Sequence, residues 1–330
     1  MPRVSINLVT WNGEKYIENC LNSIFRQTFS DFSLVLIDNG SNDKTLELIA
    51  ERFPHLPIVK HKENLGFARA YNQTIHWSRT EYVLCLNQDV VLEPNYLEEL
   101  VRFMDEHPQA GSVNGKILRM ADNENTKYID SVGLKIYKSY RVIDRGAGEV
   151  DAGQYDAVEE VFGISAAVPF YRRIALDSVA FEKEYFDEDF FSYKEDVDLA
   201  HRLRLAGWTS WLVPSAVAYH DRSVKTPANK MTKMEIARNR QRKSRFANFY
   251  SYRNHLYFII KNIPRFNFSF VWPVFWYEAM KGVYVVFCET RNLRAWSDVI
   301  KNWKRLKTKR NAIRQNIKIN PEDISEWMNQ

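Results

Sequence analysis

The first 110 residues alternate short apolar runs with amphipathic stretches, which predicts a repeated strand–helix order. The predicted strands are 4–9, 34–37, 58–60 and 82–86. The predicted helices, in which apolar residues recur every three or four positions, cover about 16–24, 44–50, 67–77 and 95–104. This order predicts an α/β fold, with a mostly parallel sheet covered by helices on both faces.

The pattern changes after residue 110. Residues 111–170 are β-like and rich in glycine, which indicates an extension of the sheet together with loops. A helix is predicted over 193–207 with Gly207 at its C-terminal cap, followed by strands over 208–213 and 216–219. Beyond residue 225 the pattern is typical of long helices. We therefore expect two regions, 1–225 and 226–330.

Four polar clusters follow the predicted strands directly. In open α/β sheets, ligands bind in the crevice outside the carboxyl ends of the strands. Each cluster alone is explained as a turn, but four of them together favour one binding crevice. The clusters are Thr10-Trp11-Asn12, Asp38–Ser41, Asn64–Gly66 and Asn87–Asp89.

Carboxylates supply the candidate chemistry. Asp89 is placed to share a divalent cation with substrate phosphates, although for this residue taken alone a cap of the following turn is the favoured explanation. Glu195 and Asp196 lie where the helix dipole stabilises acids, so a structural role is also open. The acids of 186–189 precede them, and such a stretch needs a cation or a basic partner. His220 ends a strand and is a candidate metal ligand or base.

Composition and charge narrow the function classes. The chain has 330 residues, 45% of them hydrophobic, and three cysteines, which indicates a globular protein of a reducing compartment without an export signal. No P-loop, dinucleotide-binding glycine motif or hydrolase elbow occurs. Residues 1–224 carry 24 Lys and Arg against 34 Asp and Glu, whereas 225–330 carry 22 against 7. The basic third predicts an anionic partner, with a solvated basic face as the alternative.

Taken in order, the segments 4–12, 38–43, 64–68 and 87–89, together with 185–202 and His220, resemble the inverting glycosyltransferases of family 2, which have the GT-A fold. Residues 185–202 read YFDEDFFSYKEDVDLAHR and are similar to the pattern FDExFFxYxEDxDLxxR of bacterial rhamnosyltransferases and related cell-surface polysaccharide enzymes. The resemblance covers about residues 3–225, and Arg253-Asn254 is also similar to this subgroup. It implies a donor half over about 1–110, an acceptor half over about 111–225 and a helical, basic C-terminal extension.

The resemblance implies a nucleotide-diphosphate sugar donor. Thr10, Trp11 and Asn12 would line the base pocket. Asp38 and Asn39 would reach the pyrimidine edge, where many relatives have two acids. The residues that the resemblance assigns to donor binding are Thr10, Trp11, Asn12, Asp38, Asn39, Asn64, Gly66, Arg69, Asn87 and Gln88.

Asn87-Gln88-Asp89 stands at the position of the family's DxD motif, whose first acid is missing here. The resemblance implies that Asp89 holds a divalent cation, Mn²⁺ or Mg²⁺, together with His220. Asp196 would be the general base for the acceptor hydroxyl, with Glu195 as the less favoured candidate. Such an enzyme transfers a sugar, for example rhamnose, to a glycan or polyprenyl-linked acceptor in surface polysaccharide synthesis. A catalytically inactive relative is the alternative.

The C-terminal third predicts a membrane partner. Leu293, Trp296, Ile300, Trp303 and Leu306 recur at helical spacing among many cations, as in a helix that lies in a membrane interface. A helix docked on the catalytic region is the alternative. The charge-free run 266–277 is too short to span a membrane. We expect peripheral attachment to the cytoplasmic face of the cell membrane. Nucleic-acid binding is the runner-up, and we expect no such partner because it leaves the acidic front half unexplained. The oligomeric state stays open.

Overall fold

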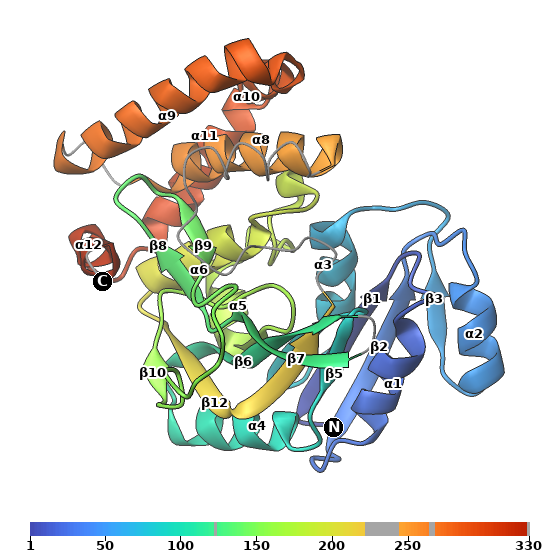
Figure 1. Ribbon diagram of the computed structural model, residues 1–330. Helices are drawn as coiled ribbons and strands as arrows, with labels where there is room; N and C mark the ends of the chain where they lie inside the picture. The colour runs from blue at the N-terminus through green and yellow to red at the C-terminus, as the bar shows by residue number, and fades with distance from the viewer. Residues whose placement is uncertain (122–123, 222–243, 264–267, 329–330) are drawn as a thin grey trace.

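The computed structural model describes residues 1–121, 124–221, 244–263 and 268–328 (Figure 1). The expected boundary at 225 and most of the basic segment 225–245 lie outside these residues. At the centre, β1 (Val4–Thr10) pairs in parallel with β4 (Tyr82–Asn87) and β2 (Phe32–Asp38), and β3 (Ile58–Lys60) extends the sheet beyond β2. The alternation predicted from the sequence is therefore confirmed in this half.

The second half of the chain extends the same ten-stranded sheet on the other side of β4. β11 (Phe170–Arg172) lies antiparallel between β4 and β6 (Ala110–Ala121), and β12 (Thr209–His220) pairs in parallel with β6. The remaining strands are β5 (Val90–Leu92), β7 (Glu124–Ser131) and β10 (Glu159–Glu160) in this sheet, and β8 (Leu134–Ile136) and β9 (Val142–Asp144) in a separate hairpin.

Helices cover both faces of the sheet because successive side chains of a strand point to opposite faces. In β4, Leu84 packs toward the first face, whereas Val83 and Cys85 pack toward the second. The first face is covered by α1 (Ile17–Phe25), α2 (Thr45–Arg52) and α4 (Tyr96–Glu106). The second is covered by α3 (Phe67–Trp77), α5 (Arg173–Val179) and α6 (Glu195–Leu205).

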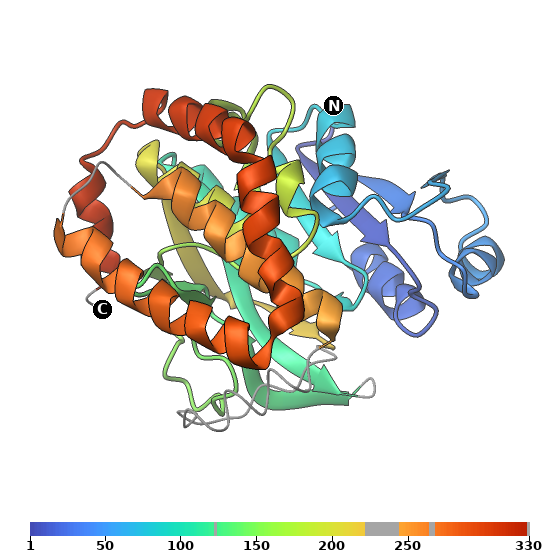
Figure 2. The same ribbon diagram turned by 90° about the horizontal axis from the view of Figure 1, so that it is seen from above.

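The C-terminal helices pack onto α6 through a third apolar core. Val197 and Ala200 of α6 share it with Phe258 of α8 (Arg245–Asn262) and with Leu306 and Ile313 of α11 (Trp303–Gln315). Both views show α9 (Phe268–Cys288) along the outside, farther from α6 than α8 is (Figures 1 and 2). The other elements are η1 (Glu188–Phe190), η2 (Thr290–Leu293), α10 (Arg294–Lys301), η3 (Pro321–Asp323) and α12 (Ile324–Trp327).

Three boundaries differ from the sequence prediction. The helix predicted from residue 193 begins at Glu195, because Tyr193 and Lys194 have φ angles of 74° and 70°, outside the helical region. The two strands predicted over 208–219 form the single strand β12, which has irregular pairing with β6 between Val213 and Val217. The periodic stretch 293–306 is divided between α10 and α11.

Candidate functional site

The side chain of Gln88 holds the loop after β1 in place through hydrogen bonds. Its Oε1 accepts hydrogen bonds from Thr10 Oγ1 at 2.5 Å and from the Trp11 amide at 2.9 Å, and its Nε2 donates to the Trp11 carbonyl at 3.0 Å. A Cβ on Gly13 would lie 2.2 Å from this Oε1 and 2.7 Å from Thr10 Oγ1, so a larger residue there would displace these side chains. Thr10 is fully buried beneath the loop, whereas the Trp11 side chain is about half exposed to solvent.

Asp38 and Asn39, at the end of β2, differ in the hydrogen bonds that their side chains make. Asn39 Nδ2 donates to Asn64 Oδ1 at 3.0 Å, and Asn39 Oδ1 accepts from the Leu65 amide at 3.0 Å. Asp38 Oδ2 accepts from the Ser41 amide at 3.1 Å, but its buried Oδ1 has no hydrogen-bond partner among the described residues. Asn39 therefore holds the 64–66 loop, whereas Asp38 keeps one acceptor oxygen for a further donor.

The structure also fixes the neighbouring loop at Asn12 and at Asn64–Gly66. Asn12 has a φ of 48°, and its Oδ1 accepts from the Asn42 amide at 2.9 Å. The Gly66 amide donates to Asn64 Oδ1 at 2.8 Å, so it is already used within the loop. Gly66 has a φ of +83°, and a Cβ there would lie 2.6 Å from Phe191. Only glycine allows this close approach.

The N-terminus of α3 is joined to the acidic segment 185–202. The Phe191 carbonyl accepts from the Phe67 amide at 2.7 Å, which occupies one of the free amides at the start of the helix. Arg69, in the first turn, is exposed. The phosphate contact expected at Arg69 thus has an accessible cation, whereas the backbone of Gly66 and Phe67 is taken by protein groups.

Asp89, His220 and Asp130 form a line of side chains at the end of β4 and β12. His220 Nδ1 lies 2.8 Å from Asp130 Oδ2, and its Nε2 lies 3.5 Å from Asp89 Oδ1. Burial lowers the pKa of His220, but Asp89 and Asp130 outweigh this effect and raise it to about 10. Asn87 Oδ1 accepts from the Tyr71 hydroxyl at 3.1 Å and faces the core.

Asp89 and His220 fit one side of a divalent-cation site. Asp89 Oδ1 is buried without a well-formed hydrogen bond among the described residues. Asp130 fixes Nδ1 of His220 and so orients Nε2 toward Asp89, where a bound cation would take the place of the Nε2 proton. No group of three or more His, Cys, Asp or Glu side chains in the described ranges could hold a metal by itself. Mg²⁺ and related ions commonly take one or two carboxylates and complete their shell with substrate phosphates and water.

Glu195 and Asp196 open α6 with different environments. Burial, with Asp196 beside it, raises the pKa of Glu195 to about 8. Burial, with Asp144 of β9 nearby, raises the pKa of Asp196 to about 6. Asp196 accepts from the Val197 amide at 2.8 Å and from the Ala166 amide at 3.2 Å, and it is more exposed than Glu195. At neutral pH Asp196 is the ionised member of the pair.

Residues 166–167 bring the two sets of acids to one edge of the sheet. The Asn87 amide donates to the Ala167 carbonyl at 3.0 Å, and the adjacent Ala166 amide donates to Asp196. Asp89 follows Asn87 by two residues. The segments that carry Asp89 and Asp196 therefore both meet the chain at residues 166–167, beside the carboxyl end of β4.

The acids of 184–198 have basic partners in the C-terminal helices. Lys309 of α11 forms ion pairs with Asp187 and, at 2.7 Å, with Glu184. Lys261 of α8 is fully buried between Asp187 and Asp198, 2.8 Å from the latter. The need for cations was predictable from the sequence, but their origin in α8 and α11 was not.

Arg253 and Asn254 hold the loop before Glu195. Asn254 Nδ2 lies within hydrogen-bond distance of the carbonyls of Phe190, Ser192 and Tyr193, at 2.9, 2.8 and 2.7 Å. Arg253 donates to the carbonyls of 189 and 190. Phe191 and Tyr193 have φ angles of 62° and 74°, a conformation that persists only where the surroundings impose it.

Sequence reasoning missed several residues of this site, because each acts only through tertiary contacts. No motif in the neighbouring sequence marks them. The missed residues are Asp130, Asp144, Lys261 and Lys309.

The fold is similar to that of the GT-A glycosyltransferases. A structure of GalNAc-T7 with UDP, GalNAc and Mn²⁺ is similar to 94% of this chain and 55% of that one, with a TM-score of 0.62 and 12% identity. TarS residues 1–349 of S. aureus, solved with UDP-GlcNAc, match 99% of this chain and 90% of that one, with a TM-score of 0.56 and 16% identity. At these identities the likeness concerns the fold alone.

Sequence comparison then gives the family. The model of glycosyl transferase family group 2 matches residues 82–297, and that of glycosyl transferase family 2 matches residues 5–149. The chain belongs to the family 2 glycosyltransferases. It is 28% identical over 249 residues to an N-acetylglucosaminyl-diphospho-decaprenol L-rhamnosyltransferase of Mycobacterium tuberculosis, covering 66% of this chain and 76% of that protein. It is 32% identical over 104 residues to the putative glycosyltransferase EpsH of Bacillus subtilis, covering 31% and 30%.

Proposed function

We propose that the protein is an inverting glycosyltransferase that moves a sugar from a nucleotide-diphosphate donor to a hydroxyl of a polyprenyl-linked glycan acceptor in surface polysaccharide synthesis. The observation that carries the proposal is that residues 166–167 hydrogen-bond both to Asp196 and to Asn87, two residues before Asp89, at one edge of the sheet. The mycobacterial relative, which acts on a diphospho-decaprenol acceptor, supports the lipid-linked acceptor and makes L-rhamnose the first donor sugar to test.

The donor loops divide the work of binding. Trp11 offers an exposed aromatic face for the base, and the unpartnered Oδ1 of Asp38 is an acceptor for an N–H of its edge. Asn39 and Asn64 keep the neighbouring loop in place. Arg69 supplies an accessible cation for a phosphate. These roles assign base recognition to Asp38 rather than Asn39.

Asp196 is the proposed general base. In a single in-line displacement, the acceptor hydroxyl attacks the anomeric carbon, and the bond to the nucleoside diphosphate breaks with inversion. The hydroxyl proton passes to Asp196, whose pKa of about 6 is well matched to neutral pH. Glu195, with a pKa of about 8, stays protonated and is not the base.

Asp89 and His220 are the residues that would hold a divalent cation, Mn²⁺ or Mg²⁺. When bound, such an ion neutralises charge on the departing diphosphate. Asp130 orients the imidazole, and the Asp221 amide donates to the Asp89 carbonyl at 2.9 Å, which fixes the backbone on which the carboxylate stands.

Attachment to the cytoplasmic membrane surface is supported by one exposed apolar face. Five side chains of α9 lie four, four, three and four positions apart, and all are exposed. These residues, the α9 stripe, are Trp272, Trp276, Met280, Val283 and Phe287. Trp296 of α10 lies next to the stripe, its ring 3.6 Å from a Cβ placed on Gly282, and Ile300 is 76% exposed.

The side chains proposed here for attachment differ from those expected from the sequence. Leu306, assigned to the membrane-facing side, is fully buried, and Lys309 is paired with Asp187. The alternative of a docked helix is therefore correct for α11, while Trp296 and Ile300 of α10 are exposed as expected. No helix among the described residues is both long enough and apolar enough to cross a membrane. An apolar stripe fits lipid better than it fits nucleic acid.

Two assays test the proposal. Purified protein is screened for binding and hydrolysis of UDP-, dTDP- and GDP-sugars with Mn²⁺ or Mg²⁺, and the absence of any donor turnover would refute the enzymatic function. Sedimentation with anionic vesicles tests attachment. Replacing Trp272, Met280 and Phe287 by Ser is expected to abolish binding. The matched control replaces the exposed Val150, Val158 and Ile174 by Ser and is expected to bind as the wild type does.

A further inference from the structure

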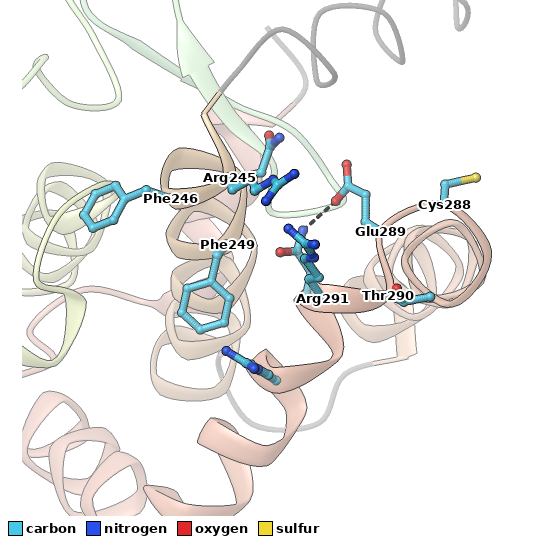
Figure 3. A pocket seen from close by; sticks show the side chains of 10 residues that line it. Arg245, Phe246, Phe249, Cys288, Glu289, Thr290 and Arg291 are labelled. Carbon is cyan, nitrogen blue, oxygen red and sulfur yellow. Dashed lines mark hydrogen bonds between the residues drawn. The ribbon is translucent and has the colours of Figure 1, made fainter.

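A pocket of about 530 Å³ lies between α8 and the turn that joins α9 to α10 (Figure 3). Its volume falls within the range of about 300–1,000 Å³ typical of small-molecule sites. Arg245 begins α8, Arg291 lies in η2 and Arg294 begins α10, and all three line the cavity. Figure 3 shows Arg245 extending from α8 toward the turn that carries Glu289 and Arg291.

The pocket lining contains more cations than acids. Among the described residues, the guanidinium groups of Arg245, Arg291 and Arg294 make no hydrogen bond or ion pair. The acid of the lining, Glu289, accepts a hydrogen bond from Asn292 Nδ2 at 2.6 Å. Three arginines that face one cavity repel each other unless an anion lies between them, and guanidinium groups suit phosphate oxygens geometrically.

Two neighbours of the pocket indicate which anion it takes. The α9 stripe ends at Phe287, which is 80% exposed and directly precedes Cys288 in the pocket wall. On the other side, Phe246 contacts Phe191 and Tyr193, with ring centroids 6.0 and 6.4 Å apart. Tyr193 is two residues from Glu195. The pocket thus lies between an apolar track and the loop that leads to the proposed base.

We propose that this pocket binds the diphosphate group of the polyprenyl-linked acceptor, with the isoprenoid chain running along the α9 stripe and the sugar directed toward Asp196. The inference rests on the proposed function for the identity of the acceptor. An isolated phosphate satisfies the arginines alone, whereas a polyprenyl diphosphate satisfies the arginines and also places its chain along the stripe, within the membrane surface in which the stripe is proposed to lie. The arginines bind and position the acceptor and take no part in the chemistry.

Alkylation of Cys288 provides the test. This thiol is exposed, whereas Cys20 and Cys85 are buried, so a maleimide reports on the pocket wall. Three soluble probes are compared at equal concentration of phosphate groups: farnesyl diphosphate, inorganic pyrophosphate, and short-chain phosphatidylglycerol below its micellar concentration, so that no membrane surface shields Cys288. We expect farnesyl diphosphate to slow alkylation at the lowest concentration. Equal protection by phosphatidylglycerol would overturn the assignment in favour of a general lipid headgroup, and equal protection by pyrophosphate would overturn the role of the stripe.

The variant R245A/R291A/R294A is expected to need at least about tenfold more farnesyl diphosphate for the same protection, which corresponds to about 1.4 kcal/mol. The matched control K301A/K304A/K307A removes three exposed cations from α10 and α11 and is expected to behave as the wild type does. Equal loss in the control would show nonspecific attraction and overturn the proposal. Donor hydrolysis is measured on the same samples. If the wild type turns over the donor but Cys288 is not protected, the proposed binding at the pocket is refuted and the proposed function stands. If the wild type does not turn over any donor, the proposed function is refuted.

Discussion

The Asp196→Asn variant is expected to lose transfer activity and to gain stability at neutral pH. The carboxyl pKa is raised from 3.8 to about 6 in the folded protein. The unfolded chain therefore releases this proton at lower pH, and folding stability falls as pH rises from about 4 through 6. The shift of about two units corresponds to about 3 kcal/mol at most.

Two effects reduce this gain. Asp196 is partly exposed, so solvent screens its charge, and the amide group of Asn can lose the hydrogen bond from the Ala166 amide, which costs about 1 kcal/mol. We expect a net gain of about 1–2 kcal/mol at pH 8, or an increase of several degrees in Tm. At pH 5 the gain should shrink, because the wild-type carboxyl is then largely protonated.

The assay combines thermal denaturation at pH 5 and pH 8 with single-turnover transfer. Transfer by the wild type should rise as pH increases through about 6, since the base must be ionised. Glu195→Gln is the matched control: Glu195 is already neutral at pH 7, so its conversion should change rate and Tm little there. An Asp196→Asn variant that keeps near wild-type turnover, or that loses stability at pH 8, would refute the reasoning.

Three further outcomes are expected. Asn254→Ala removes the donor shared by three loop carbonyls and should lower kcat more than donor affinity, with a loss of about 2–3 kcal/mol in unfolding free energy, measured by urea denaturation. Lys309→Met leaves Asp187 with one lysine fewer in the core and should cost about 3 kcal/mol, whereas Arg305→Gln on the exposed side of α11 should cost less than about 1. Chelation of divalent cations should stop transfer by the wild type, and excess Mn²⁺ should restore it. Asp89→Asn should stay inactive at every Mn²⁺ concentration; activity of that variant would exclude Asp89 as a ligand.

The sheet and its covering helices were predictable because their signals are local. Apolar runs, helical spacing and strand-end polar clusters each lie within about ten residues, and β3 was predicted with the bounds Ile58–Lys60. The start of α6 was not predictable in this way. Tyr193 and Lys194 have positive φ angles in a loop whose carbonyls accept hydrogen bonds from Asn254, about 60 residues later. Composition indicated that the acids needed cations, but only the packing of α8 and α11 shows where these cations come from.

The candidate site was predictable to the level of its loops. Asp38 and Asn39 are adjacent in the sequence and chemically similar, and only their different hydrogen bonds in the folded protein distinguish their roles. The same applies to Glu195 and Asp196, whose different burial sets different pKa values. Asp130 and Asp144 reach their partners from strands whose sequences contain no motif. Such distinctions depend on contacts between distant segments and are absent from any single stretch of sequence.

The pairing of Lys261 and Lys309 with the acids of 184–198 has a practical consequence for engineering. The acids and the lysines come from different parts of the chain. A hybrid that takes its first 225 residues from this protein and its remainder from a parent without both lysines would therefore leave buried acids unpaired. Swapped halves should express as insoluble protein unless both lysines and their acids travel together. The C-terminal third is therefore more safely altered by single substitutions on its exposed surface, which leave these ion pairs in place.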